Sequence, residues 1–335
     1  MKKISLHEKI FVAGSRGMAG SAICRALKKH GYGTNTNRGE LLTPVRQELN
    51  LLDSNALNNW FLKNKPTVVV LAAGKVGGIL ANSNSPTEFL LENIKIQTNV
   101  IETSWRFGVK RLLFLGSSCI YPKFAHQPIS EDSLLSGPLE LTNQWYAIAK
   151  ITGIKLCKSL RTQYGFDAIS LMPTNLYGPG DNYHPTNSHV MASLIKKFCE
   201  ASFYSIKSVN CWGSGTPLRE FLHVDDLGEA VVFALENWDP SSKNAPLDNS
   251  GVPLDFLNVG SGKDISIKDL SKKIAQFSGF DGEVVWDSTK PDGTPKKQLD
   301  CKRINNLGWN AQINLDEGLK ETVCNYMAKL KQTLE

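Results

Sequence analysis

The feature that most constrains this chain is a glycine triplet between an apolar strand-like segment and an amphipathic helix-like one. KIFVA (9–13) is followed at once by GSRGMAG, which contains Gly14, Gly17 and Gly20, and apolar residues then recur at helical spacing over 18–30. Glycines at such positions permit a tight turn and a close backbone approach, and a helix N-terminus favours an anionic pyrophosphate. The sequence therefore predicts a dinucleotide-binding βα unit.

Strand-like and helix-like segments go on alternating through the first half of the chain. The run TVVVLAA is continuously apolar and rich in β-branched residues, as expected of a parallel strand that is covered on both faces. The helix candidates are 54–64, 89–107 and 142–165, and the strand candidates are 67–73, 111–118 and 168–175. Repeated units of this kind predict an α/β fold with a Rossmann-type doubly wound parallel sheet.

Beyond Gly178 the alternation loosens, and clusters of Pro, Asn and Gly appear at 178–188 and 239–253. We expect the second cluster to be an exposed loop. The pattern predicts two interleaved domains. Residues 1–180 with about 223–261 would form the cofactor-binding Rossmann domain. Residues from about 181–222 with 262–335 would form a smaller C-terminal substrate-binding lobe.

Composition excludes several classes of protein. Lysine and arginine total 38 against 32 acidic residues, a net charge of +6 that is spread along the chain, so we expect an anionic small-molecule ligand and no nucleic acid. No apolar run approaches the roughly 18–20 residues that cross a bilayer, which predicts no membrane association. The seven cysteines form no CxxC pair, which argues against a disulfide framework and a metal site. No secretion signal is evident, so we expect a cytoplasmic protein.

Two arginines indicate which dinucleotide is preferred. An NAD site usually has an acidic residue after the second strand to hold the ribose hydroxyls. Here Arg46 follows that apolar segment and Arg16 lies within the glycine loop, although Glu48 is nearby. Because two guanidinium groups can grip a 2′-phosphate, NADPH/NADP is favoured over NAD as the cofactor.

Tyr146 and Lys150 are one turn apart on the long helix candidate and therefore share a face. The ammonium group is expected to lower the tyrosine pKa and make its hydroxyl a usable acid or base. Ser117, at the end of a buried strand candidate, is placed to hydrogen-bond a substrate oxygen. Together with the glycine loop, these residues predict hydride transfer at a C–O centre.

Two further side chains are candidates for proton transfer. Cys119 lies two residues after Ser117, and in an extended backbone the two side chains point to the same face. His189 lies in the loop-like HPTNSHV stretch. Cys119 alone is as compatible with a packing role as with a catalytic one, and a lone histidine such as His189 is more often structural.

Several longer blocks carry a family resemblance, from GSRGMAGSAI and LAAGKVGGI to FLGSSCIYPK, TNQWYAIAKITGIKLC, MPTNLYGPGDNYHPTNSHV, WGSGTPLREFLHVDDL and KPDGTPKKQLD. With them the chain resembles the GDP-L-fucose synthases, bifunctional members of the extended short-chain dehydrogenase/reductase family. The resemblance implies an NADPH-dependent homodimer. It also implies 3,5-epimerisation and then 4-reduction of GDP-4-keto-6-deoxy-D-mannose to GDP-L-fucose.

The resemblance also implies residue roles. Tyr146 would be the proton donor, Lys150 would hold the nicotinamide ribose, Ser117 would orient the carbonyl, and Cys119 and His189 would be the epimerisation acid/base pair. The implied cofactor contacts are Gly14, Ser15, Arg16, Gly17, Met18, Ala19, Gly20, Arg46, Leu51, Leu115, Gly116, Ser117, Ser118, Lys150, Pro173, Thr174, Asn175, Leu176 and His189. The implied GDP-sugar contacts are Lys197, Trp212, Arg219 and Asp292.

Two other functions compete with this interpretation. One is a nucleotide-sugar 4-epimerase with tightly held NAD and no reactive thiol, which Arg16, Arg46 and Cys119 disfavour. The other is a catalytically silent NADP-binding regulator, which the intact Tyr146, Lys150 and Ser117 disfavour.

Overall fold

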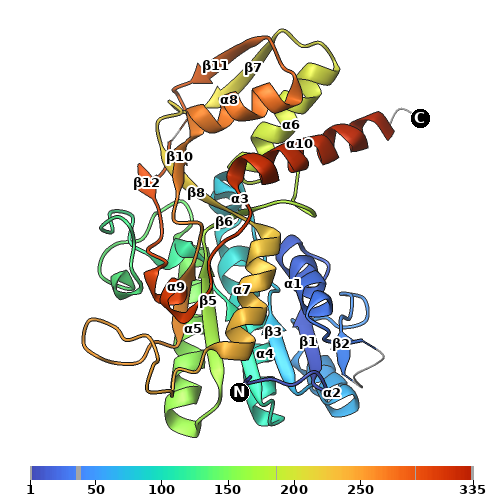
Figure 1. Cartoon of the computed structure of the whole chain (residues 1–335), viewed down its shortest axis with the longest axis vertical. Helices are drawn as coiled ribbons and strands as arrows, with labels where there is room; N and C mark the ends of the chain where they lie inside the picture. Colours follow the sequence, from blue (N-terminus) through green and yellow to red (C-terminus); the bar gives the residue numbers. More distant parts are fainter. Residues whose placement is uncertain (1, 35–38, 186, 291, 333–335) are drawn as a thin grey trace.

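The predicted parallel sheet is present in the computed structural model, which describes residues 2–34, 39–185, 187–290 and 292–332 (Figure 1). Thr186 and Pro291, each inside one of the quoted sequence blocks, lie outside the described residues. Six strands pair in parallel in the order β2-β1-β3-β4-β5-β9. Their bounds are β1 Lys9–Ala13, β2 Glu40–Leu42, β3 Val68–Leu71, β4 Arg111–Leu115, β5 Ala168–Pro173 and β9 Phe256–Val259.

The order of the strands fixes where a ligand can enter. From β1 the chain moves to β2 on one side, and it then returns to β3 on the other side of β1. Ile10 pairs with Leu41 on one side and with Val68 on the other. Where the order of strand addition reverses in this way, a crevice opens outside the carboxyl ends of the strands. Here the crevice lies between β1 and β3. The glycine triplet begins at this point.

Helices cover both faces of the sheet, as a doubly wound fold requires (Figure 1). α1 (Met18–Lys29) packs against α7 (Val224–Asn237) on one face, and α2 (Ser54–Asn64), α4 (Pro86–Arg106) and α5 (Gln144–Tyr164) pack together on the other. α4 begins three residues before the predicted start at Phe89, because Pro86 suits the first turn of a helix. α5 ends as predicted at Gly165, which has a φ of 68°.

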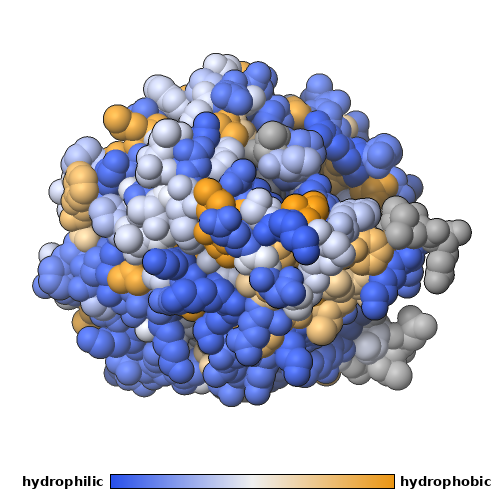
Figure 2. Space-filling model, turned by 90° about the horizontal axis from the view of Figure 1, so that it is seen from above, coloured by the Kyte–Doolittle hydropathy of each residue, from blue (hydrophilic) through white to orange (hydrophobic). Residues whose placement is uncertain are grey.

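A second, smaller hydrophobic core lies beyond the carboxyl ends of the sheet, at the top of Figure 1. Its helices are α6 (Val190–Phe203), α8 (Ile267–Ser278) and α10 (Leu315–Gln332). Its strands are β7 (Ser208–Trp212) with β11 (Glu283–Asp287), and β8 (Leu218–His223) with β6 (Asn175–Tyr177), β10 (Asp264–Ser266) and β12 (Lys296–Lys297). The shorter elements are α3 (Ile79–Asn84), α9 (Lys302–Leu307), and the 3₁₀ turns η1 (Ser118–Ile120) and η2 (Glu131–Ser133). Seen from this end, the surface is mostly hydrophilic, with hydrophobic residues in separate patches (Figure 2).

One predicted strand proves to be two. The segment 168–175 leaves the large sheet after Pro173, and Asn175 begins β6, which pairs with β8. The backbone N–H of Thr174 still donates to Val259 in the large sheet, while its hydroxyl donates to the carbonyl of Glu220 in β8. This segment therefore ties the large sheet to the smaller one beside the cavity described below.

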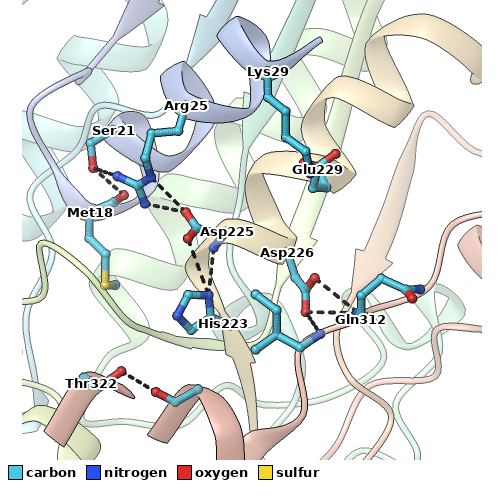
Figure 3. A network of polar contacts seen from close by, with 12 residues as sticks. Met18, Ser21, Arg25, Lys29, His223, Asp225, Asp226, Glu229, Gln312 and Thr322 are labelled. Atoms are coloured by element: carbon cyan, nitrogen blue, oxygen red, sulfur yellow. Dashed lines mark hydrogen bonds and ion pairs between the residues drawn. The ribbon is translucent and has the colours of Figure 1, made fainter. Parts of the chain in front are cut away.

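Polar contacts hold the helix that follows the glycine loop against its neighbours (Figure 3). Arg25 of α1 donates from Nε to Asp225 of α7 at 3.0 Å. The adjacent Asp226 is buried and accepts the backbone N–H groups of Gln312 and Ile313, just before α10. The first turn of α7 thus links the glycine-loop helix to the C-terminal segment.

The C-terminal part of the chain contributes to both cores. Cys301, Ile304 and Trp309 pack into the large core, whereas Leu319 and Val323 pack into the smaller one. The sequence-derived domain boundaries therefore remain a prediction. In the part of the chain that the structure describes, no helix is both long enough and apolar enough to span a bilayer.

Candidate functional site

A cavity of about 1040 Å³ opens at the carboxyl ends of the parallel strands and extends to the smaller core. Every residue that the sequence singled out for catalysis, cofactor binding or substrate binding lines it. These residues come from segments between Gly14 and Asp292 that are widely separated in the chain. The structure thus brings the candidates together in space, while their individual roles remain predictions.

Close contacts explain the glycines of the cofactor loop. Gly14 has a φ of 88°, and a Cβ there would lie 2.7 Å from the backbone nitrogen of Ala73, just after β3. A Cβ on Gly20 would lie 2.1 Å from the carbonyl oxygen of Gly14. Gly17 directly precedes α1, so the N-terminus of that helix faces the cavity. In the described structure the buried Ser15 Oγ has no hydrogen-bond partner, which leaves a donor for a phosphate oxygen.

The two arginines border the same end of the cavity. Arg16 and Arg46 are both exposed. The Glu48 carboxylate forms a hydrogen bond within its own loop, because its Oε2 accepts the backbone N–H of Val45 at 3.0 Å. Leu51 adds an apolar wall nearby. This end of the cavity therefore offers positive charge to a ligand.

Tyr146 and Lys150 lie on the inner face of α5, as their spacing predicts. The Lys150 ammonium donates to the carbonyl oxygen of Leu115 at 2.8 Å, and burial lowers its pKa to about 8. The expectation that it lowers the Tyr146 pKa is wrong for this structure. Burial raises the pKa of Tyr146, the negative charge of ionised Cys119 adds to this, and a hydrogen bond with Ser117 opposes it. Tyr146 is thus a neutral proton donor at neutral pH.

The backbone between Ser117 and Cys119 is not extended, contrary to the assumption behind their predicted shared face. Residues 118–120 form the 3₁₀ turn η1, in which Ser117 Oγ accepts the backbone N–H of Cys119 at 3.3 Å. Both side chains nevertheless line the cavity. The Cys119 sulfur accepts from Asn143 Nδ2 at 3.5 Å and from Lys297 Nζ at 3.6 Å.

His189 occupies the N-cap position of α6 and faces the same cavity. Its side chain is open to the solvent of the cavity, yet protein surrounds it on most sides. This burial lowers the pKa of His189, and the positive charge of Lys297 lowers it further. The imidazole is therefore predominantly neutral at neutral pH.

The far end of the cavity is lined by β7, β8 and the segment before β12. Lys197 Nζ and Lys290 Nζ each lie 5.7 Å from the ring centroid of Trp212. The Arg219 guanidinium donates to the carbonyl oxygen of Asp292 at 3.3 Å. Burial lowers the pKa of Arg219. The Asp292 carboxylate in turn accepts from the backbone and hydroxyl of Ser214 at 2.7 and 2.8 Å. An aromatic face and several cations thus stand side by side.

Sequence reasoning missed three residues that line the cavity, Asn143, Trp286 and Lys297, and a fourth, Lys290, that contacts the cavity residue Trp212. Asn143 and Lys297 contact the Cys119 sulfur, Lys290 lies over Trp212, and Trp286 lines the cavity beside them. Asn143 and Lys297 fall inside the quoted blocks TNQWYAIAKITGIKLC and KPDGTPKKQLD, which was the available signal. Among the described residues, no group of three or more His, Cys, Asp or Glu side chains is arranged to hold a metal ion.

Comparisons with known proteins agree with this geometry. The model of the NAD dependent epimerase/dehydratase family matches residues 10–246. The chain is 52% identical over 315 residues to "Probable GDP-L-fucose synthase 1" of Oryza sativa subsp. japonica, covering 94% of this chain and 90% of that protein. It is 49% identical to the GDP-L-fucose synthase of Escherichia coli (strain K12), covering 94% and 95%.

A solved structure of a GDP-L-fucose synthetase has a similar fold. The GDP-L-fucose synthetase of Naegleria fowleri bound to NADP superposes with a TM-score of 0.84 at 26% sequence identity. The match covers 98% of this chain and 96% of that one. The large sheet and the smaller core are therefore both shared with that protein.

Proposed function

The chain belongs to the NAD dependent epimerase/dehydratase family, and on that premise we propose that it is a GDP-L-fucose synthase. It would convert GDP-4-keto-6-deoxy-D-mannose to GDP-L-fucose by 3,5-epimerisation and then NADPH-dependent 4-reduction. The observation that carries the proposal is the single cavity that holds two chemical groups of residues. One group is Ser117, Tyr146 and Lys150, and the other is Cys119 and His189.

The residues at the glycine loop fit NADPH. The unpaired Ser15 hydroxyl and the N-terminus of α1 suit the pyrophosphate, and the exposed Arg16 and Arg46 suit the 2′-phosphate. Pro173 and its neighbours up to Leu176 line the cavity and would form its wall at the nicotinamide end. When bound there, NADPH supplies a hydride for the C4 carbon.

Epimerisation needs only that protons be removed and returned beside the ketone. A C4 carbonyl acidifies the C–H bonds at C3 and C5, because the resulting carbanion is an enolate. Ser117 and Tyr146 would hold the ketone oxygen, while Cys119 and His189 would exchange protons with the two carbons. Reduction removes the carbonyl and with it this acidity, so epimerisation must come first.

Tyr146 would complete the reduction by protonating the developing C4 oxyanion. Its raised pKa keeps the hydroxyl protonated at neutral pH, so it is a donor when the substrate arrives. Lys150 would hold the nicotinamide ribose, and its contact with Leu115 fixes the ammonium at the carboxyl end of β4. The neighbouring Ser117 would keep the carbonyl oriented.

The GDP moiety would occupy the far end of the cavity. Arg219 and Lys197 suit the diphosphate charges, and Trp212 offers a flat aromatic surface on which guanine can stack. Asp292 would accept hydrogen bonds from the nucleotide. The nearby Lys290 adds positive charge.

We also propose a homodimer built on α4 and α5. Both helices leave large apolar side chains on the outside, among them Leu91, Trp145 and Ile148, which are 47%, 39% and 38% exposed. Light scattering should give twice the chain mass, and Trp145→Asp with Ile148→Asp should give a monomer. A wild-type mass of one chain would reject this arrangement. The cytoplasmic location remains a prediction.

One assay tests the main proposal. Purified protein is mixed with NADPH and GDP-4-keto-6-deoxy-D-mannose, NADPH oxidation is followed, and the configuration of the product at C3, C4 and C5 is determined by NMR. We expect GDP-L-fucose. If NADPH is not oxidised here, but a nucleotide sugar that carries a 4-hydroxyl is inverted at C4 with no net cofactor consumption, the protein is instead a 4-epimerase. No turnover of either substrate would favour a regulator.

A further inference from the structure

The sulfur of Cys119 is contacted by a lysine that sequence analysis assigned no role. Lys297 Nζ lies 3.6 Å from Cys119 Sγ, across 178 positions of sequence. Lys297 is the second residue of the two-residue strand β12, where it pairs with Arg219 of β8. The lysine is thus placed by the smaller sheet, whereas Cys119 follows a strand of the large one. The contact forms where the two parts of the molecule meet.

A second donor reaches the same sulfur. Asn143 Nδ2 donates to Cys119 Sγ at 3.5 Å, and Asn143 is the N-cap residue of α5, the helix that carries Tyr146 and Lys150. Two N–H donors, one of them charged, are therefore directed at a single sulfur atom. A thiolate accepts such hydrogen bonds strongly, whereas a neutral thiol is a weak acceptor.

The remaining contacts of Lys297 do not neutralise its charge. Its neighbour in β12, Lys296, is paired with Asp264 at 3.0 Å, but no carboxylate of the described chain lies within ion-pair distance of Lys297. The nearby carboxylate of Glu140 is bound to Lys123 at 2.9 Å. A small cavity of about 20 Å³ adjoins the contact, which is room for about one water molecule that can solvate the ammonium.

We propose that Lys297 is a positioning residue for epimerisation, and that it acts with Asn143 to hold Cys119 in the cavity as a thiolate. The ionised sulfur can then take a proton from a carbon beside the ketone, becoming a thiol while the substrate becomes an enolate. The ammonium keeps its own protons throughout. This inference rests on the proposed function only for the identity of the substrate, because the state of the sulfur is a property of the free protein.

The surrounding charges favour Lys297 as the main influence. The titratable groups that face the sulfur are Tyr146 and Lys150 from α5, and Lys297 from β12. Tyr121, Lys123 and Glu140 also line the small cavity beside it, where Lys123 and Glu140 form an ion pair with each other at 2.9 Å. Tyr146 is neutral at neutral pH, and the Lys150 ammonium is directed to the carbonyl oxygen of Leu115. Lys297 is the cation in hydrogen-bond contact with the sulfur.

The test measures the reactivity of Cys119 in the full-length protein without substrate. Iodoacetamide alkylates thiolates, and peptide mass spectrometry gives the rate for Cys119 separately from the other cysteines. With Lys297→Met we expect that rate at pH 7 to fall about tenfold, because removing an adjacent cation lowers the thiolate fraction. The two rates should converge at high pH, where both thiols are ionised.

Three comparisons make the result specific. Lys297→Arg should recover most of the rate, because it restores the charge, whereas Lys296→Met should behave as the wild type. The alkylation rate of the half-buried Cys24 should be the same in all variants.

With substrate, Lys297→Met should slow deuterium uptake at C3 and C5 from heavy water more than it slows hydride transfer.

Two results would overturn the proposal. One is a wild-type alkylation profile for Cys119 in Lys297→Met between pH 6 and 9. The other is an equal loss in Lys297→Arg and Lys297→Met, which would show that the shape of the lysine matters and its charge does not. If alkylation behaves as expected but no GDP-L-fucose forms, the proposed function fails and the thiolate contact stands.

Discussion

The two sides of the cavity are built differently. The cofactor side is made by loops that directly follow neighbouring parallel strands, and its glycines are required by backbone contacts such as that between Gly14 and Ala73. The substrate side is assembled from β7, β8, β12 and the start of α6, which meet only after the smaller core has formed. Function on the first side therefore depends on local geometry, and on the second side it depends on long-range contacts such as that between Cys119 and Lys297.

The two sets of catalytic candidates follow the same division. Tyr146 and Lys150 project from one helix that is packed on the large sheet, so their relation is fixed by helix geometry. Cys119 lies in a 3₁₀ turn that follows β4 of the large sheet, whereas His189 is the N-cap residue of α6, a helix of the smaller core. Substitutions should therefore separate reduction from epimerisation.

The largest effect is expected from Tyr146→Phe on the cofactor side. The variant keeps the ring and its edge contact with Phe89 but removes the proton donor for the C4 oxygen. General acid catalysis contributes about 10²–10⁴-fold, so the rate of NADPH oxidation should fall within that range. Tyr121→Phe is the control, because it also removes a buried hydroxyl, one that donates to Asn258 at 2.6 Å. Near-normal turnover in Tyr146→Phe would show that another group protonates the oxygen.

A somewhat smaller effect is expected from Cys119→Ser, and it should fall on epimerisation. The hydroxyl resembles the thiol in shape but ionises far less readily, so deuterium uptake at C3 and C5 should slow by about 10²-fold, the lower end of acid–base effects. Ser117, Tyr146 and Lys150 remain, so reduction continues and sugars of the wrong C3 or C5 configuration should accumulate.

The matched control for this variant is Cys24→Ser, which changes a half-buried cysteine of α1 that does not line the cavity. Its deuterium uptake should equal that of the wild type. If Cys119→Ser exchanges both protons at the wild-type rate and yields only GDP-L-fucose, then Cys119 is a packing residue.

The same division explains what the sequence could reveal. The strand–glycine–helix unit, the buried strands and the Tyr146–Lys150 spacing are local patterns, and the structure contains each of them. The positions of Arg219 and Asp292 came from family resemblance, since nothing in their local pattern shows that they meet. Lys297 was missed because its partner Cys119 is far away in sequence, and β12, which places it, has only two residues.

Two errors of sequence reasoning have physical causes. The side chains of Ser117 and Cys119 were compared as if on one strand, but the Ser117 hydroxyl accepts the Cys119 N–H and so begins a 3₁₀ turn. The effect of the Lys150 charge on Tyr146 was considered without burial, which has the largest influence on both pKa values. Burial is a tertiary property that a four-residue spacing does not contain.

A third, smaller effect concerns cofactor selectivity. Replacing Arg16 and Arg46 together by alanine should weaken NADPH binding about tenfold and leave NADH binding nearly unchanged, because exposed ion pairs contribute modestly. Arg25→Ala is the control, since Arg25 lies on α1 and is bound to Asp225. Titration calorimetry with both cofactors checks this. An equal loss for NADPH and NADH would contradict the 2′-phosphate assignment.

The smallest effect is a pH dependence of stability from Lys150. Its pKa is lowered from 10.5 to about 8 by burial, so between these values the unfolded chain binds more protons than the folded one. Stability therefore rises with pH in that window, and below pH 8 the lysine contributes almost no slope. Relative to Lys150→Met, the wild type should gain about 1 kcal/mol in unfolding free energy between pH 7 and 9.

Denaturant titrations of both proteins measure this difference. The control is Lys155→Met, on the outer face of α5, whose difference in unfolding free energy from the wild type should not change with pH. If the difference in unfolding free energy between Lys150→Met and the wild type also does not change with pH, the ammonium is solvated or ion-paired in the folded protein. The cofactor side is then less enclosed than its geometry indicates.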